Sequence, residues 1–498
     1  MGIVQKDALR TTVISYLGLI LGYTNKVVLF LLLLSLEQIG LINLIFALGA
    51  LFAQFSNLGT INLTWRFFPF LKNKETKHYG FLTLNILIVL TGIFFFSTLL
   101  LLLGDIIMSY FSDKSQLFVD YYYWVIPVGI GIVLFKLLDN YLRALFKNVF
   151  QVFANEIIYR LSVTILLLIY WSGYLTFEQL FVALCLVQFI PAILLIIYLI
   201  RLGEFQFSPK NISIPKRFRK IILRYSAFSY VNTLGAVLVI SLDSIMITAM
   251  LGLSYNGVYS TVIYMIAVLM VPYSSIMRVS APLVSVHWKE REMEKMKKLY
   301  QQVSSVSLFI GLFCFMGVWV SREEIFSLLP EEFQPGVYIF LFLMMGRMLD
   351  MYFGLNGTIL VTSKKYRYDV LFTGLLIVMV IVLNLYLIPI WGVIGAAIST
   401  CSAYFGYNIL RMLFVWYHYR LHPFVLSQFL IMGVFTAEIV AFELIPFDLG
   451  GVWLNMGVNT LLVVLVFPVL VYILRIEPET VNYVDKVKGV IIKKITHE

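Results

Sequence analysis

The sequence predicts an all-α integral membrane protein with 14 transmembrane helices and both termini in the cytoplasm. Fourteen apolar stretches fill the chain of 498 residues, and each has about the 20 residues or more that a helix needs to cross a bilayer. Most of the 37 Lys and Arg residues fall into every second connector between these stretches. Because Lys and Arg collect in cytoplasmic connectors, this alternation predicts the orientation.

The apolar stretches follow one another through short connectors. They lie at residues 11–35, 40–68, 79–103, 119–143, 150–172, 176–200, 222–250, 255–285, 301–321, 335–361, 368–388, 391–416, 423–444 and 453–474. The first is too long for a secretory signal and has no small-residue cleavage site after it, so we expect a true span. The longest inner connector, residues 201–224, divides the first twelve stretches into two sets of six.

Composition places the protein in lipid. Hydrophobic residues make up 61% of the chain and charged residues 13%, whereas a soluble domain carries about 25% charged residues. The net charge of +10 lies in cytoplasmic connectors, where attraction to anionic lipid explains it more simply than a nucleic-acid partner. Cys185, Cys314 and Cys401 all lie in apolar stretches, which argues against disulfides and a zinc site.

The sequence shows no signature of an enzyme. It has no Walker A motif, and its 5 His residues show no metal-ligand spacing. We therefore expect a secondary-type transporter that has neither cofactor nor metal and is driven by an ion gradient or the membrane potential. The sequence leaves open whether H⁺ or Na⁺ is the coupling ion.

The second and eighth stretches look like copies of one another. The second opens at residues 37–40 (Glu-Gln-Ile-Gly) and ends at Arg66. The eighth opens around Gly257 and ends with Arg278 and Pro282. Both begin at an outer Gly turn and reach the inner face through Arg and Pro, which is typical of parallel repeats in transporters.

Three groups of residues occur in order along the chain. They are residues 37–40 with Leu58, Gly59 and Arg66; Asp243 with Gly252, residues 257–259 and Pro282; and Asn384 with residues 387–400 (Leu-Ile-Pro-Ile-Trp-Gly-Val-Ile-Gly-Ala-Ala-Ile-Ser-Thr). In these groups the chain resembles the Wzx-type polysaccharide flippases of the multidrug/oligosaccharidyl-lipid/polysaccharide (MOP) exporter superfamily. The third group is the most specific, because it is similar to that family's Asn, Leu-Ile-Pro and Gly-x-x-Gly-Ala-Ala before the twelfth helix.

The resemblance covers essentially the whole chain and implies an architecture. It implies two six-helix lobes, related by a pseudo-twofold axis around a central cavity, plus two C-terminal helices. We assign residues 1–205 to the N-terminal lobe, 206–420 to the C-terminal lobe, and 421–498 to the last two helices and a cytoplasmic tail.

The resemblance also implies a function. A flippase of this family translocates undecaprenyl-pyrophosphate-linked oligosaccharide across the bacterial cytoplasmic (inner) membrane for O-antigen, capsule or exopolysaccharide assembly. Its partners are the lipid-linked oligosaccharide, membrane lipids and the polysaccharide polymerase machinery. Two alternatives stay open, a flippase for the peptidoglycan precursor lipid II and a MATE-like multidrug/cation antiporter. A polymerase or ligase is disfavoured, because it needs a large external loop that the chain lacks.

The first stretch carries a polar face. On a helical wheel Tyr23, Asn25 and Lys26 fall on the same half as Gly18 and Gly22, and a helix facing lipid all round does not segregate in this way. Small residues also mark helix packing. Lys26 lies too far from either end to reach water easily, so we expect this face to line the cavity.

The seventh stretch shows a similar stripe of Ser, Thr and Tyr, with Tyr230 on it and Asp243 at its flank. The first and seventh stretches hold equivalent places in the two halves, where a cavity between lobes draws its walls. Asp243 is either part of that wall or a hydrogen-bond partner between helices. Tyr23 and Tyr230 are also candidates to stack on sugar rings.

Further charges lie within the stretches. They are Lys136 with Asp139, Glu156 with Arg160, Arg347 with Asp350, and the single residues Arg66, Arg278 and Glu438. The three pairs have the spacing that puts both charges on one helix face, so each pair either neutralises itself or serves the substrate. Arg66 and Arg278 lie near cytoplasmic ends and either reach water or join the cavity.

These charges suit a doubly anionic pyrophosphate. Its passage through hydrocarbon without compensation is prohibitive, and a cavity lined by Arg, Lys and hydroxyl groups replaces its hydration. We expect the substrate to contact Lys26, Arg347, Arg66, Arg278, Asn25, Tyr23 and Tyr230. The acids Asp243, Asp350 and Glu156 are candidate sites for the coupling ion.

Overall fold

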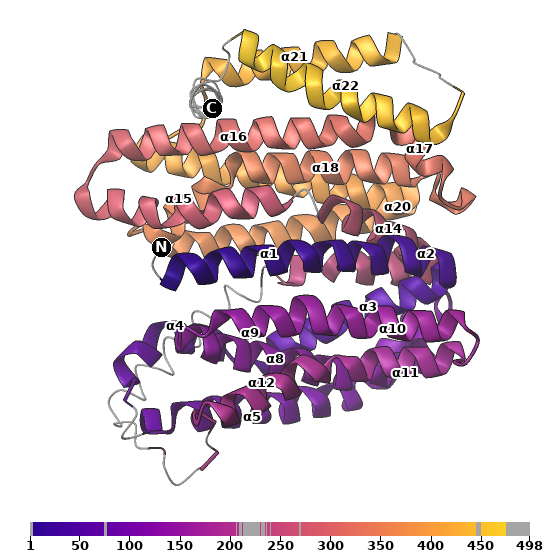
Figure 1. The fold of residues 1–498 in the computed structure, drawn as a ribbon, viewed down its shortest axis with the longest axis vertical. Coiled ribbons are helices and arrows are strands. Elements are labelled where there is room, and N and C mark those ends of the chain that lie inside the picture. Colours follow the sequence, from indigo (N-terminus) through magenta and orange to yellow (C-terminus); the bar gives the residue numbers. More distant parts are fainter. Residues whose placement is uncertain are drawn as a thin grey trace, which may run out of the picture. The chain divides into compact units, whose positions relative to one another are not determined.

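The structure is a computed structural model that describes most of the chain (Figure 1). The described residues are 3–73, 77–205, 207–208, 212, 230, 235, 237–239, 241–267, 270–444 and 450–474, and among them the side chains of residues 3–9, 62, 65, 66 and 77 are not described. All regular elements in these ranges are helical. The chain divides into two compact units, Met1–Met265 and Ile266–Glu498.

Many of the helices are long and apolar enough to cross a membrane. In the described ranges 11 helices qualify, or up to 12 if α14 (Leu253–Ala267) and α15 (Met270–Glu290) form one bent span. The protein is therefore a multi-pass membrane protein. The count of 14 spans and the cytoplasmic location of both termini stay predictions.

The first unit is built from short and long helices in succession. They are α1 (Ile3–Tyr23), η1 (Thr24–Leu29), α2 (Phe30–Leu33), α3 (Leu36–Ser56), α4 (Thr60–Leu71), η2 (Lys77–Gly80), α5 (Phe81–Leu102), α6 (Gly104–Ser109), α7 (Gln116–Tyr121), η3 (Tyr122–Trp124), α8 (Val125–Ala144), α9 (Asn148–Phe153), η4 (Ala154–Tyr159), α10 (Arg160–Trp171), α11 (Phe177–Val187), α12 (Phe189–Arg201) and most of α14. Its core lies where α3 packs against α5 and α8.

The second predicted span, residues 40–68, is longer in the structure and is broken. Its helix α3 begins four residues earlier, because Ser35 and Gln38 form a capping box that satisfies the first backbone N–H groups. The break lies at Leu58 and Gly59, which have φ angles of 47° and 82°. This left-handed turn ends α3 and starts α4 in a new direction.

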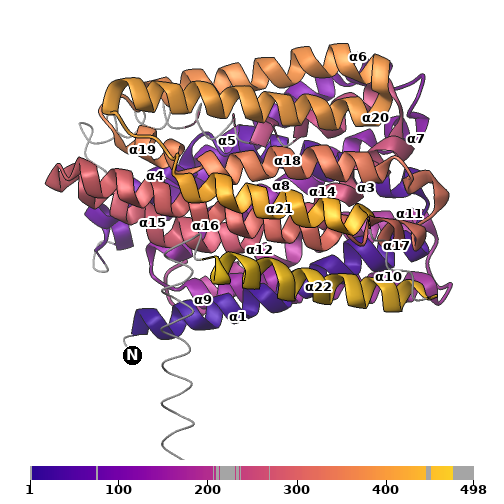
Figure 2. The ribbon, with the colours of Figure 1, turned by 90° about the horizontal axis from the view of Figure 1, so that it is seen from above.

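The second unit continues from α15. It contains α16 (Met293–Trp319), α17 (Arg322–Ser327), η6 (Glu331–Phe333), α18 (Gly336–Phe353), α19 (Leu355–Thr362), α20 (Arg367–Tyr419), α21 (Leu426–Leu444) and α22 (Val452–Ile473). Figures 1 and 2 show α21 and α22 side by side next to α16. Leu312 and Met316 of α16 share an apolar core with Ile431 of α21 and Phe467 of α22.

Helix α20 is two antiparallel arms rather than one rod. A straight helix of 53 residues is about 80 Å long, far more than the roughly 30 Å of hydrocarbon it has to cross. Gly392 divides it with φ 58° and ψ −138°, a backbone conformation that is essentially restricted to glycine. Ser399 Oγ then donates to the Val380 carbonyl oxygen at 3.3 Å across the arms. The arms correspond to the predicted spans 368–388 and 391–416, and the Gly-x-x-Gly motif forms their turn.

Candidate functional site

Lys26 lies in the π-helical turn η1, and a short chain of hydrogen bonds joins it to two other helices. Its Nζ donates to Asn43 Oδ1 of α3 at 3.0 Å. Asn43 Nδ2 in turn donates to Ser260 Oγ of α14 at 2.6 Å. Asn43 and Ser260 are both buried. Lys26 therefore ties η1, α3 and α14 together.

Three aromatic rings surround the same ammonium. Its Nζ lies 4.5 Å from the ring centroid of Phe30, 5.6 Å from that of Phe46 and 5.0 Å from that of Tyr264. Such cation–π contacts add to the hydrogen bond when the charge is shielded from water. The ammonium of Lys26 thus has partners within the first unit.

Asn25 is part of a contact between helices. Its side chain is buried; its Nδ2 donates to the Arg160 carbonyl oxygen at 2.8 Å, and its Oδ1 accepts from Thr164 Oγ1 at 2.7 Å. These bonds attach η1 to α10. Tyr23, two residues earlier, is exposed, as expected of a side chain that faces a cavity, water or lipid.

Glu156 and Arg160 form an ion pair of 2.6 Å that begins in the second π-helical turn, η4. Arg160 Nη1 also donates to the Gly18 carbonyl oxygen at 2.5 Å. A Cβ at Gly22 would lie 2.0 Å from Arg160 Nη1, so the absence of a side chain at Gly22 makes room for the guanidinium. The glycine face of α1 therefore packs on an arginine, and Glu156 neutralises its charge.

Asp243 is buried and accepts a hydrogen bond of 2.6 Å from the Tyr259 hydroxyl of α14. This contact corresponds to the alternative in which Asp243 is a hydrogen-bond partner between helices. The Tyr230 hydroxyl donates to the Phe55 carbonyl oxygen near the end of α3 at 2.7 Å.

The two glycine motifs of the predicted repeats meet in the first unit. A Cβ at Gly40 would lie 1.9 Å from the Leu253 carbonyl oxygen, and a Cβ at Gly257 would lie 2.3 Å from the Leu36 carbonyl oxygen. Asn256 Nδ2 donates to the Gly40 carbonyl oxygen at 3.1 Å. Helices α3 and α14 thus cross in backbone contact, which only glycine permits at both positions.

The second unit contains a cavity of about 390 Å³, which we call the Arg411 cavity. It is lined by Tyr273, Asp350, Gly354, Gly357, Thr358, Val361, Thr362 and Arg411. Arg411 comes from the second arm of α20 and forms an ion pair with the buried Asp369 of the first arm. Arg411 Nε is buried and has no hydrogen-bond partner among the described residues.

Sequence reasoning missed Arg411. It lies near the end of the predicted span 391–416, close to the basic connector that follows. The signal in the sequence was Asp369 on the preceding stretch. A helical hairpin brings the start of its first arm, where Asp369 lies, next to the end of its second arm, where Arg411 lies. A Cβ at Gly357 would lie 2.5 Å from Arg411 Nη2, so this glycine also makes room for a guanidinium.

Arg347 and Asp350, which lie one turn apart on α18, reach different partners on α20. Arg347 Nη1 donates to the Tyr404 hydroxyl at 3.2 Å, and its guanidinium carbon lies 5.3 Å from the centroid of that ring. Asp350 Oδ1 accepts from Asn408 Nδ2 at 3.3 Å. Of these two, Asp350 lines the Arg411 cavity.

The remaining predicted residues lie elsewhere. Arg278 is exposed on α15 and donates to Ser275 Oγ at 3.3 Å. The Arg66 side chain lies outside the described part of the structure. Asp139 pairs with Arg143 at 3.0 Å, although the sequence paired it with Lys136. Glu438 is buried, and neither of its carboxylate oxygens has a partner among the described residues.

Two curated proteins match part of the chain. It is 22% identical over 191 residues to the "Probable low-salt glycan biosynthesis flippase Agl15" of Haloferax volcanii, and 23% identical over 190 residues to the "Capsular polysaccharide biosynthesis protein CapF" of Staphylococcus aureus. Each match covers 38% of this chain, and the matches span 40% and 48% of the two relatives. No family model matches the sequence.

Solved structures match over most of the chain. The lipid II flippase MurJ in an inward closed conformation gives a TM-score of 0.71 at 15% identity, over 93% of this chain and 98% of MurJ. An inward-facing multidrug resistance transporter of the MATE family, within the MOP superfamily, gives 0.64 at 13% identity, over 85% of this chain and 96% of that one. The chain therefore shares its fold with these two transporters.

Proposed function

We propose that this protein is a flippase that translocates undecaprenyl-pyrophosphate-linked oligosaccharide across the bacterial cytoplasmic membrane by alternating access, for O-antigen, capsule or exopolysaccharide assembly. The names of two relatives, from glycan and capsule biosynthesis, support the class of substrate. The observation that carries the proposal is the Arg411 cavity, lined by a guanidinium whose Nε is buried and has no partner among the described residues.

A buried N–H group without a partner favours an acceptor ligand. Leaving such a donor unpaired costs about 1–3 kcal/mol, and more when the group is charged. A phosphate oxygen accepts from guanidinium N–H groups in a strong, charge-assisted bond. Tyr273 and Thr358 line the same cavity, and their hydroxyls are further possible donors. The cavity can therefore replace part of the hydration of a pyrophosphate.

The acids beside Arg411 provide a means of coupling. Asp369 already pairs with Arg411, and Asp350 lines the cavity. A proton or a Na⁺ ion on Asp350 removes a negative charge that otherwise repels the substrate phosphate. We propose Asp350 as the first candidate for coupling. Asp243 and Glu156 come after it, because they are bonded to Tyr259 and Arg160.

A lipid II flippase is the second candidate, because the fold match to MurJ covers 93% of the chain. Both substrates carry a pyrophosphate on a polyprenyl chain, so the Arg411 cavity suits either. They differ in the glycan and in the peptide that only lipid II carries. A direct comparison of the two substrates therefore distinguishes the candidates.

Translocation in proteoliposomes tests the proposal. Radiolabelled undecaprenyl-pyrophosphate oligosaccharide or lipid II is placed in vesicles with the purified full chain, and a membrane-impermeant hydrolase reports the fraction that reaches the outer leaflet. We expect translocation of the oligosaccharide and a loss of at least about tenfold in Arg411→Gln, since one charge-assisted bond is worth about 1.5–3 kcal/mol. Arg411→Lys keeps the charge but not the planar fork, and should lie between the two.

Arg367→Gln is the matched control. Arg367 is an exposed cation at the same end of the α20 hairpin as Arg411, and it does not line the cavity. The Arg367→Gln protein should therefore translocate substrate like the parent protein. Transport of lipid II alone would replace the first candidate by the second. Transport of neither substrate by the correctly folded parent protein would refute both.

A further inference from the structure

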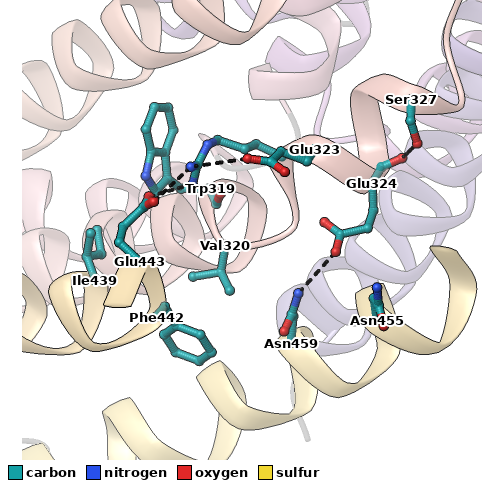
Figure 3. Close-up of a pocket in the computed structure, with 11 residues that line it drawn as sticks. Trp319, Val320, Glu323, Glu324, Ser327, Ile439, Phe442, Glu443, Asn455 and Asn459 are labelled. Atoms are coloured by element: carbon teal, nitrogen blue, oxygen red, sulfur yellow. Dashed lines mark hydrogen bonds and ion pairs between the residues drawn. The ribbon is translucent and has the colours of Figure 1, made fainter. Parts of the chain in front are cut away.

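Figure 3 shows a second cavity of the second unit, of about 410 Å³. It lies at the end of α16 and the start of α22, away from the residues that line the Arg411 cavity. We call it the Trp319 cavity. It is lined by Trp319, Val320, Arg322, Glu323, Glu324, Ser327, Ile439, Phe442, Glu443, Asn455 and Asn459. The lining comes from the C-terminal ends of α16 and α21, from α17, and from the first turns of α22. This volume lies within the range of about 300–1,000 Å³ found for small-molecule sites.

The one guanidinium among the described residues of this lining is already engaged. Arg322 Nη1 lies 2.7 Å from Glu443 Oε1, and Arg322 Nη2 lies 3.6 Å from Glu323 Oε1. The guanidinium carbon also lies 4.7 Å from the centroid of the Trp319 ring. The described lining contributes three carboxylates and one guanidinium and therefore a net negative charge. A phosphate group is therefore repelled from this cavity, in contrast to the Arg411 cavity.

Glu324 provides acceptors that the protein leaves largely unused. Its Oε1 accepts a hydrogen bond from Asn459 Nδ2 at a long distance of 3.4 Å. Figure 3 shows the Glu324 carboxylate pointing towards Asn459 of α22. Asn459 is itself only 6% exposed. An ionised carboxylate only accepts hydrogen bonds. A matching ligand must donate O–H or N–H groups and carry no negative charge.

The place of the cavity narrows the ligand further. Helix α16 starts within the basic segment 289–298, and its other end forms the cavity. By the distribution of Lys and Arg, the basic start of α16 is cytoplasmic and the cavity lies at the outer face of the membrane. In a flippase the oligosaccharide reaches that face during translocation.

We propose that the Trp319 cavity binds a sugar ring of the translocated glycan, one that is neutral or bears an amine. This inference rests on the proposed flippase function and assigns different parts of the substrate to the two cavities. The Arg411 cavity holds the anionic pyrophosphate, and the acidic Trp319 cavity holds hydroxyl groups of the glycan at the other end of the same unit. Glu324 and Asn459 are the residues that contact the sugar.

Saturation-transfer NMR on the purified full chain in detergent tests the proposal without transport. The probes are methyl glucoside, methyl galactoside, N-acetylglucosamine and glucosamine, with ethanolamine to represent a lipid headgroup and inorganic pyrophosphate as an anionic competitor. We expect saturable binding of at least one sugar, no displacement of that sugar by pyrophosphate, and about tenfold weaker sugar binding in Glu324→Gln. Asn459→Asp removes the amide donor at similar volume and should also weaken binding.

Glu332→Gln is the matched control, since it removes an exposed carboxylate from the same connector outside the cavity. Binding of ethanolamine but of no sugar, absence of saturable binding, or equal affinities in Glu324→Gln and Glu332→Gln each overturn the proposal. The flippase proposal fails separately, through the proteoliposome assay. Sugar binding that depends on Glu324 in a chain that translocates neither substrate would keep the site and refute the flippase.

Discussion

The hydrogen bond between Lys26 and Asn43 gives the sharpest test of how the first unit holds a charge in the membrane. Replacement of Asn43 by Leu removes the only oxygen that accepts from the ammonium in the described structure, at 3.0 Å. A hydrogen bond to a charged group contributes about 1.5–3 kcal/mol. The rings of Phe30 and Tyr264 remain and keep part of the stabilisation. We therefore expect Asn43→Leu to lower the free energy of unfolding by about 2 kcal/mol.

The double mutant decides whether this cost belongs to the pair. Lys26→Met alone leaves Asn43 Oδ1 without its donor, at a cost of about 1–2 kcal/mol. Lys26→Met with Asn43→Leu removes both polar groups, so the two losses should not add. We expect a coupling energy of about 1.5–3 kcal/mol in the double-mutant cycle. The free energies come from denaturation of the full chain in bicelles, followed by circular dichroism.

Translocation measured on the same four proteins separates structure from transport. If Lys26 only joins η1 to α3 and α14, the double mutant should regain transport together with stability. If the substrate also needs its charge, the double mutant stays inactive although it is stable. A coupling energy below about 0.5 kcal/mol would refute the reasoning, because the bond would then contribute nothing to the fold.

Three further predictions concern single residues. Gly257→Ala should destabilise the protein by about 1–3 kcal/mol, because its Cβ would lie 2.3 Å from the Leu36 carbonyl oxygen. The control Gly374→Ala has open space around its Cβ and should stabilise the protein by up to about 1 kcal/mol. Equal melting temperatures of the two variants would contradict the close crossing of α3 and α14. Glu438→Leu should raise the melting temperature, because it removes a buried carboxyl group whose oxygens lack partners in the described residues. Arg347→Ala should abolish surface polysaccharide in a complementation assay while the protein remains inserted, and normal surface glycan would remove Arg347 from the substrate path.

The class of the protein could be predicted because it depends on local sequence. Apolar stretches of span length and alternating basic connectors are readable without any tertiary information. The motif around Gly392 could also be placed, since a turn with positive φ requires glycine. The start of α3 was missed, although Ser35 and Gln38 form a readable capping box. A span that is predicted from hydrophobicity starts at the first apolar residues. It therefore leaves out the polar residues that cap the helix.

Partners far apart in the sequence could not be predicted. Asn43 and Ser260, which hold Lys26 in place, are 217 residues apart. Arg411 and its partner Asp369 lie 42 residues apart, on the two arms of the α20 hairpin. A polar residue in a span indicates that a partner is present, but only the packing of the helices shows which residue that partner is.

The π-helical turn η1 explains why Gly18, Gly22 and Lys26 of the first span contact different helices. A wheel at 100° per residue places Lys26 on the same face as Gly18 and Gly22. In η1 the Phe30 backbone N–H bonds to the Asn25 carbonyl oxygen, five residues back, and this wider turn changes the angle between successive side chains. Gly18 and Gly22 consequently meet Arg160 of α10, whereas the Lys26 ammonium meets α3.

The same irregularity recurs where Glu156 begins the ion pair with Arg160, in η4. The elements α1, η1, η4 and α10 pack on one another, so both π turns lie within one polar contact between helices. π turns occur frequently at functional sites, because they cost regular hydrogen bonding and persist where a side chain has to be redirected. Here each turn directs one charge, Lys26 towards α3 and Glu156 towards Arg160. A register change of the first span would separate Lys26 from Asn43 and the Gly18 carbonyl oxygen from Arg160, so the first span can move only if both polar contacts rearrange together.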